Sequence, residues 1–440
     1  MNRHHGAMTA GYGKATITPP LRVESAAELA VELAGYGYFL RRRAENVLDD
    51  LYARALYIET DTARWMLICC DLLGLAQSVV ERIFTGLHER YGLNREQVTI
   101  VSVHTHTGPA IVAHTGCGEV DLEYTSGVAN KILGACDEAI QTTATVTALT
   151  GTVTPLNGIY VYNRSDSDAP IDNYVRGLRI ERDGGCAISL VSHACHPVFR
   201  GRIPSVSADY PGEVNALFEK NGEASIYLNG VCGDIDPYIP SGVSRSEQLA
   251  RYARSIQEGF NTNHVSLATT LTTRRFSYEL GIRPMTAEDV RETADRRVAR
   301  IMRDGVPPPW SIEEGAARVV RIWEQTMLVR IDREGALAAV EPVSISAVCL
   351  GGVWIVALPY EAFTCVGQIA RENGAGNGAL ILGCAEELRG YLPARKDYEL
   401  EAYASQESAF LYKRQPIMQG EAERFGAWIG GMCARIQSAL

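Results

Sequence analysis

The chain has 440 residues, of which 46% are hydrophobic and 21% are charged, so it can bury a large core as one large domain or roughly two or three smaller ones. The net charge of −10 is spread along the chain, which excludes nucleic acid as an expected partner. The chain has no apolar window of about 18 residues, no signal-like N-terminus and no Cys-x-x-Cys pair among its 11 cysteines, so we expect a cytoplasmic protein with reduced, mostly buried cysteines.

The N-terminal part of the chain reads as strands separated by turns. A short strand over residues 11–20 is followed by a glycine-rich loop at 35–38 and by apolar strands at 52–59 and 65–71. Asp71 closes the last of these strands. Ligands collect at this edge of open α/β sheets, so Asp71 is a candidate to bind substrate, and the alternative is that it caps the following helix.

Two histidines follow the next strand. An amphipathic helix at 78–91 leads into a β-branched run at 98–103, which predicts a parallel crossover from the strand before the helix. His104 and His106 then precede a Gly-Pro stop. In an extended chain both rings lie on one face, where they either share a metal ion or divide metal binding and proton transfer; the alternative is two hydrogen-bonded histidines at a strand end.

The same pattern recurs further along the chain. After a helix at about 126–141, strands near 178–181 and 187–191 flank the turn Asp183-Gly184-Gly185, which predicts a hairpin. The second strand runs into His193 and His196, again before a proline. Two strand ends of this kind in a chain with only nine histidines indicate a metal-binding or catalytic role.

A glycine-rich loop with two aspartates follows the strand at 224–229. Its glycines let backbone N–H groups approach a ligand, and Asp234 and Asp236 offer oxygen ligands or proton acceptors. The alternative is an ordinary turn stabilised by aspartate.

Carboxylate and phenol groups gather in the C-terminal third. Residues 265–330 are predicted to be a peripheral, mainly helical segment, after which a buried strand at 353–358 ends shortly before Glu361. We expect Glu361 to open a helix, either as a first-turn glutamate that favours the helix dipole or as a further metal ligand. A loop with Tyr391 and Tyr398 and a closing helix near 420–438 complete the chain.

Several common enzyme signatures are missing. The sequence has no Gly-x-Ser-x-Gly elbow, His-Glu-x-x-His helix, phosphate-binding loop or dinucleotide fingerprint, which disfavours the usual serine hydrolases, zinc proteases, NTPases and dehydrogenases. The predicted elements together indicate an α/β fold with mixed β-sheets flanked by helices, formed by residues 1–440 as one large domain.

Taken in order, these stretches resemble the neutral (alkaline) ceramidases and their bacterial relatives. The family's motifs are Thr-His-Thr-His-Ser-Gly-Pro, Asn-Arg-Ser, His-Pro-Thr, Gly-Asp-x-Ser-Pro, Pro-Gly-Glu and a tyrosine pair seven residues apart. Their counterparts here are residues 103–109, 163–165, 196–198, 233–237, 359–361 and the pair Tyr391 and Tyr398. The resemblance covers nearly the whole chain and implies a ceramidase-like catalytic domain without the family's C-terminal β-rich domain.

The resemblance also implies a set of site residues. It places zinc on a set of four residues, with His106 and Asp236 as further catalytic groups and Arg164 on the substrate. The four zinc ligands it implies are His104, His196, Glu361 and Tyr391, the last of which is also catalytic. Asp236 departs from the family, because the family has serine there; it serves either as a base or as a partner for a cationic amine.

The predicted function follows from this set. We expect a zinc-dependent hydrolase in which zinc activates water to cleave the amide bond of a small soluble N-acyl compound. His106 would move protons to the leaving amine or stabilise the oxyanion. No stable membrane association is expected, and a homo-oligomer is compatible with the sequence. The alternatives are a zinc esterase or lactonase and a non-catalytic zinc-containing binding protein.

Overall fold

The computed structural model describes residues 7–21, 31–303 and 305–438. Its larger sheet is mixed and contains nine strands. These are β1 (Thr9–Thr16), β3 (Tyr52–Glu59), β4 (Arg64–Cys70), β5 (Val98–Ser102), β6 (Ala144–Pro155), β8 (Tyr174–Arg182), β9 (Ile188–His193), β11 (Ala224–Asn229) and β13 (Val265–Ser266). The strand order is β11-β9-β8-β6-β1-β3-β4-β5, with β13 beside β6.

A second sheet and three small strand pairs complete the β structure. The four-stranded sheet has the order β14 (Leu271–Gly281), β15 (Val340–Leu350), β16 (Val353–Ala357) and β18 (Leu380–Leu382). The pairs are β2 (Asn46–Val47) with β10 (Ser205–Val206), β7 (Val161–Asn163) with β12 (Ile235–Pro237), and β17 (Glu361–Ala362) with β19 (Tyr391–Leu392).

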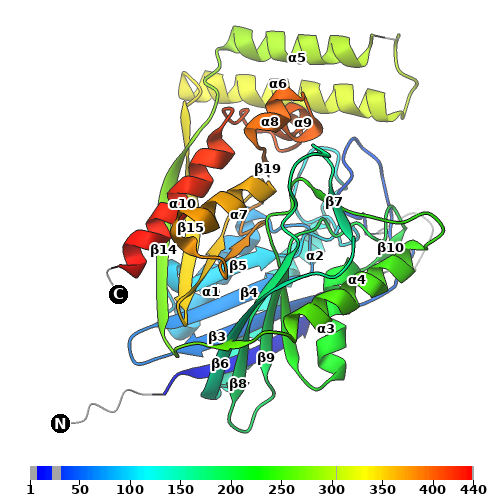
Figure 1. Cartoon of the computed structure of the whole chain (residues 1–440). Helices are drawn as coiled ribbons and strands as arrows, with labels where there is room; N and C mark the ends of the chain where they lie inside the picture. Colours follow the sequence, from blue (N-terminus) through cyan, green and yellow to red (C-terminus); the bar gives the residue numbers. More distant parts are fainter. Residues whose placement is uncertain (1–6, 22–30, 304, 439–440) are drawn as a thin grey trace.

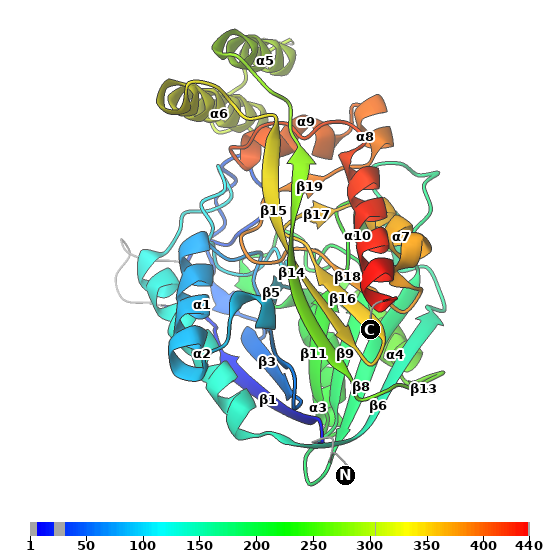
Figure 2. The same cartoon turned by 90° about the vertical axis from the view of Figure 1, so that its left-hand side faces the viewer.

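Helices cover the outer faces of the sheets and one end of the molecule (Figures 1 and 2). They are α1 (Gln77–Tyr91), α2 (Leu122–Gln141), α3 (Asp209–Lys220), α4 (Arg245–Phe260), α5 (Ala287–Ile301), α6 (Ile312–Glu334), α7 (Thr364–Ala370), α8 (Arg395–Glu399), α9 (Tyr403–Leu411) and α10 (Glu421–Gln437). Figure 2 shows α1 and α2 outside the larger sheet and α10 and α7 outside the smaller one. The mixed α/β expectation is therefore confirmed.

The alternation of side chains along β4 shows why the two sheets stack. Leu67 and Cys69 belong to a core shared with residues of β16 and β18, whereas Met66 and Ile68 pack in a second core with α1 and α2. Because successive residues of a strand point to opposite faces, a strand that is apolar throughout must be covered on both sides. The layers therefore run helix, sheet, sheet, helix.

Several local expectations are confirmed. The strands β4 and β5 are parallel across the α1 crossover, and β8 and β9 form the predicted antiparallel hairpin. Eight of the 11 cysteines are buried and all 11 are free. In the described ranges, no helix combines the length and the hydrophobicity needed to cross a bilayer.

Other expectations are wrong at particular residues. The helix after β5 begins at Leu122, four residues earlier than expected, because Asp121 caps it by accepting a hydrogen bond from the Tyr124 amide. Glu361 does not open a helix: it lies in β17, and the next helix begins at Thr364.

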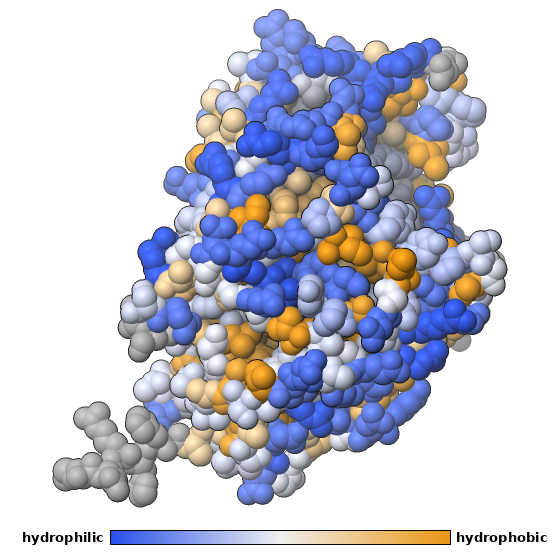
Figure 3. Space-filling view, in the orientation of Figure 1, coloured by the Kyte–Doolittle hydropathy of each residue, from blue (hydrophilic) through white to orange (hydrophobic). Residues whose placement is uncertain are grey.

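Residues 265–330 divide between the body of the fold and its edge. The strand β14 pairs with β15 over 11 positions as part of the smaller sheet. The helices α5 and α6 lie together at one end of the molecule (Figure 1), where the surface is mainly hydrophilic (Figure 3).

Candidate metal centre

His104 lies in a sharp turn just after β5. The strand ends at Ser102, and His104 has a left-handed backbone with φ 74°. The expectation that strand alternation aligns His104 with His106 is therefore wrong, although the turn does bring the two rings together. The Nδ1 atom lies 2.7 Å from the Leu73 carbonyl oxygen and Nε2 lies 3.1 Å from Glu361 Oε2.

His196 approaches the same carboxylate from another strand. It follows β9 by three residues and is fully buried. Its Nδ1 lies 2.7 Å from the Cys232 carbonyl oxygen, and its Nε2 lies 3.0 Å from Glu361 Oε2. The two histidines thus present Nε2 to the same carboxylate oxygen.

These contacts decide which ring nitrogens are free to bind a metal. A carbonyl oxygen only accepts hydrogen bonds, so we assign the proton of His104 and of His196 to Nδ1. In this tautomer both Nε2 atoms carry lone pairs that face the Glu361 carboxylate. Nitrogen and oxygen donors that converge in this way fit a cation such as zinc, and the carbonyl contacts on Nδ1 are those that orient metal-binding histidines.

The charge state of Glu361 fits the same interpretation. Burial raises the pKa of this carboxyl group, but His104 and His196 outweigh burial and hold the pKa well below its usual value. For His104, burial lowers the pKa, and Glu361 more than offsets it, so the pKa is raised. The Glu361 carboxyl group is therefore ionised at neutral pH.

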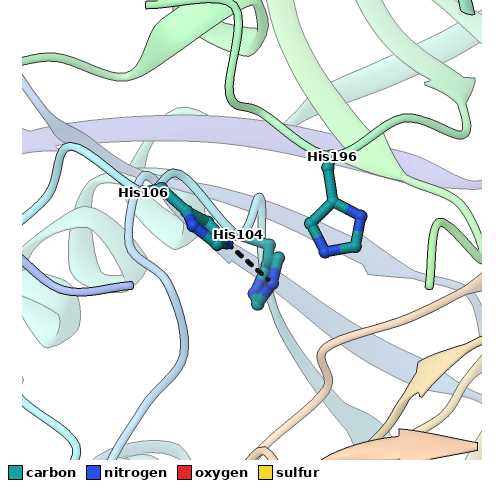
Figure 4. A group of neighbouring side chains, drawn as sticks. All are labelled: His104, His106 and His196. Atoms are coloured by element: carbon teal, nitrogen blue, oxygen red, sulfur yellow. Dashed lines mark hydrogen bonds between the residues drawn. The ribbon is translucent and has the colours of Figure 1, made fainter. Parts of the chain in front are cut away.

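His106 is the third imidazole of the cluster (Figure 4). Its Nε2 lies 3.4 Å from Nε2 of His104, and one ligand atom from each of the three rings lies within 4.8 Å of the others. Its Nδ1 is buried with no hydrogen-bond partner in the described part of the chain, because Gly35 packs against it: a Cβ there would lie 2.5 Å from Nδ1. Burial and the neighbouring imidazoles lower the pKa of His106 well below its usual value.

Glu361 and Tyr391 are held together by the pairing of β17 with β19. The two residues are direct partners in this parallel pair. The Tyr391 hydroxyl accepts a hydrogen bond of 3.0 Å from Arg164 Nη2, and its ring stacks on His196 at 6.3 Å between centroids. Burial, followed by the charge of Glu361, raises the pKa of Tyr391 well above its usual value.

A further tyrosine was missed by sequence reasoning. Tyr412 donates a very short hydrogen bond to Oε1 of Glu361, the oxygen that does not face the two Nε2 atoms. Its ring packs against the His114 ring, with 4.3 Å between the ring centroids. No local motif marks Tyr412; the residue lies just after α9, and only the fold brings it to Glu361.

Arg164 and Asp236 lie beside the centre. Arg164 donates to the Gly233 carbonyl oxygen at 2.8 Å, and its Nη1 lies 3.3 Å from Asp236 Oδ1. Asp236 Oδ1 is also 3.9 Å from His196 Nδ1. Both side chains keep about a quarter of their surface exposed, 23% for Arg164 and 24% for Asp236, so they are accessible to a ligand.

The other two aspartates have structural partners. Asp234 accepts hydrogen bonds from the amide and hydroxyl of Thr364 at the start of α7, so it links two distant segments rather than stabilising its own turn. Asp71 is 1% exposed and forms a 2.7 Å ion pair with Arg54. It does not cap α1, whose N-cap is Ala76, and its burial disfavours the predicted contact with substrate.

Comparisons with known proteins bear on the fold. No family model and no curated protein matches the sequence. Among solved structures, the chain is similar to neutral ceramidase from Pseudomonas aeruginosa, with a TM-score of 0.70 and 15% identity over 99% of this chain and 75% of that one. A ceramidase complexed with C2 gives a TM-score of 0.69 and 15% identity over 99% and 76%. The chain therefore has the neutral ceramidase fold.

Proposed function

We propose that this protein is a zinc-dependent hydrolase that cleaves the amide bond of a small soluble N-acyl compound. The observation that carries the proposal is the convergence of His104 Nε2 and His196 Nε2 on one oxygen of Glu361, at 3.1 and 3.0 Å. Two imidazoles and one carboxylate form the donor set of a catalytic zinc site. The ceramidase fold supports an amide as the bond that is cleaved.

The ligands of the zinc ion would be His104, His196, Glu361 and Tyr391. When bound, zinc would act as a Lewis acid that activates water and polarises the amide carbonyl. The carbonyls of Leu73 and Cys232 keep the two imidazoles in the binding tautomer.

His106 would handle the protons of the reaction. Its lowered pKa keeps the imidazole neutral at pH 7, so that Nε2 can accept a proton from the attacking water. The same ring can then deliver the proton to the nitrogen of the leaving amine. Since its Nδ1 has no acceptor among the described residues, no hydrogen bond there restricts which nitrogen carries the proton.

Arg164 and Asp236 would orient the substrate. Arg164 is held by Gly233, Tyr391 and Asp236, so its guanidinium is fixed beside the ligand Tyr391. Asp236 has no hydroxyl with which to form an acyl-enzyme ester, so attack by water rather than by a side chain fits this position.

The test compares two neighbouring histidines. We expect His104→Ala to lose zinc and more than about 100-fold in kcat/KM towards a panel of N-acyl amines. We expect His106→Ala to keep zinc and to lose about 10² to 10⁴-fold in kcat. Metal analysis and steady-state kinetics give both quantities, and full activity in a metal-poor His104→Ala protein would contradict the proposal. The ester that matches the best amide tests the alternative of an esterase or lactonase.

A further inference from the structure

The segment before β2 folds tightly over His106. Five consecutive residues, 35 to 39, have positive φ, and three of them are not glycine: Tyr36, Tyr38 and Phe39 at 62°, 55° and 59°. Left-handed backbone is unfavourable for such residues and persists where the surrounding structure imposes it, often near functional sites. Tyr36 packs edge-on against the His106 ring, with 5.0 Å between the ring centroids. This segment and the residues that pack on it therefore form one wall of the metal centre.

A buried arginine in this wall has no counter-ion among the described residues. Arg42 is 7% exposed, and its Nη2 donates to the carbonyl oxygens of Ala34 and His106, the latter at 2.7 Å. Its Nε and Nη1 are also buried, with no hydrogen-bond partner in the described ranges, and no described carboxylate forms an ion pair with it. A buried charge in this state is unfavourable unless an anion compensates it.

A second arginine adds to the positive charge. The guanidinium carbons of Arg42 and Arg202 lie 4.7 and 5.1 Å from the centroid of the same Tyr36 ring. Arg202 is exposed and has no ion pair within the described part of the chain. Burial lowers the pKa of Arg42 to about 10, with Tyr36 acting against this shift and the like charge of Arg202 adding to it.

The described carboxylates whose charges act on Tyr36 or that lie in this wall already have partners. Asp209 accepts hydrogen bonds from the backbone amides of Phe199, Arg200 and Tyr210. Asp236 pairs with Arg164, and Glu32 pairs with Arg41. None of the three forms an ion pair with Arg42 or Arg202, so among the described residues the charge of these two arginines has no carboxylate partner.

We propose that Arg202 binds a carboxylate of the substrate, with the charge of buried Arg42 behind it, so that the substrate class is N-acyl amino acids. The inference rests on the proposed amide hydrolysis. The Arg202 guanidinium lies over the Tyr36 ring, and that ring packs edge-on against His106, so an anion bound to Arg202 lies beside the metal centre. In an N-acyl amino acid the carboxylate carbon is three bonds from the amide carbonyl carbon, and guanidinium groups bind carboxylates with two parallel hydrogen bonds.

The reaction balances without a further reagent. Water adds its oxygen to the carbonyl carbon, the C–N bond breaks, and the released amino group takes a proton from the attacking water. The products are a carboxylic acid and a free amino acid.

The experiment uses a matched pair of substrates, N-acetyl-L-leucine and its neutral analogue N-acetyl-L-leucinamide, with cleavage of the acetyl group measured for both. We expect the zinc-loaded wild-type protein to prefer the carboxylate by at least about 30-fold in kcat/KM. Arg202→Ala should reduce this preference about 10-fold, and Arg42→Met, which removes only the buried charge behind it, should reduce it less. Arg251→Ala, an exposed arginine of α4, is the matched control and should keep the wild-type preference.

The outcomes separate this inference from the proposed function. Cleavage without a carboxylate preference, or an equal preference in Arg202→Ala, overturns the anion site and leaves amide hydrolysis standing. If neither compound is cleaved, calorimetric binding decides: tighter binding of N-acetyl-L-leucine that is lost in Arg202→Ala supports the anion site even though the proposed function fails. Because Arg42→Met removes a contact to His106, a variant that fails to fold leaves Arg202→Ala to decide.

Discussion

The nitrogen and oxygen donors of the metal centre come from two regions that support them differently. His104 and His196 follow β5 and β9 of the nine-stranded sheet, whose residues are buried throughout these strands. Each ring is fixed through Nδ1 by backbone carbonyls, Leu73 for His104 and Cys232 and Ile235 for His196. Glu361 and Tyr391 instead lie in two-residue strands that pair only with each other, and their oxygens are held by the side chains of Tyr412 and Arg164.

This difference indicates how each region tolerates change. A backbone carbonyl contact survives most substitutions, so the imidazoles keep their orientation as long as the sheet folds. The oxygen donors depend on single side-chain hydrogen bonds, each of which one substitution can remove. We call Glu361 and Tyr391 the oxygen side of the centre. Substitutions that act on the oxygen side should change metal affinity by different amounts, and the following variants test that expectation.

The largest of these effects is expected from Glu361→Gln. The amide keeps the size of the side chain but removes the negative charge that faces both Nε2 atoms, so zinc affinity should fall by more than about 100-fold. Competition with a chromophoric chelator measures the dissociation constant. Glu387→Gln, at a half-buried carboxylate paired with Arg414, is the control and should bind zinc like the wild type. Equal affinities in both variants would show that Glu361 is not a ligand.

A smaller effect is expected from Tyr412→Phe. Loss of the hydroxyl leaves Oε1 of Glu361 without its donor and frees the carboxylate to rotate, which should weaken zinc binding about 10-fold. Tyr398→Phe is the matched control, because the Tyr398 hydroxyl donates to the Ile417 carbonyl oxygen at 2.9 Å instead. If the two variants bind zinc equally, Tyr412 does not organise the oxygen side.

The two regions also differ in how far sequence reasoning reached. The histidines were found because the signal is local: a β-branched run followed directly by His-x-His or by His-Pro. The reason given for their alignment was wrong, since a left-handed turn at His104, and not strand alternation, brings the rings together. Residue types therefore predicted the donors but not the backbone that presents them.

The oxygen side depends on contacts between distant residues. Glu361 was expected in a helix, but β17 exists only through its pairing with Tyr391, which lies 30 positions later in the chain. Tyr412 and Arg42 carry no motif at all. Their roles arise when α9 and the segment before β2 pack against the centre, and nothing in the local sequence specifies that packing.

A fourth histidine, His193, shows that local sequence was also limited for the histidines. His193 and His196 lie three residues apart, and the sequence pattern did not separate them. His193 is still in β9, and its Nδ1 lies 2.6 Å from the Tyr252 hydroxyl, away from the metal centre. Only His196, beyond the end of the strand, reaches Glu361.

The last expected effect concerns His193 and is a pH dependence of stability. Burial lowers the pKa of His193 to about 4. In the unfolded chain the pKa is about 6.5, so between these values the unfolded state binds more protons and stability falls as the pH decreases. From pH 7 to pH 5 this loss is on the order of 2 kcal/mol in the free energy of unfolding.

His193→Gln should lose less stability over this range, whereas His88→Gln, at an exposed position of α1, should behave like the wild type. Urea unfolding of the metal-free proteins at both pH values measures the difference. Parallel losses in wild type and His193→Gln would mean that burial does not lower the pKa of His193.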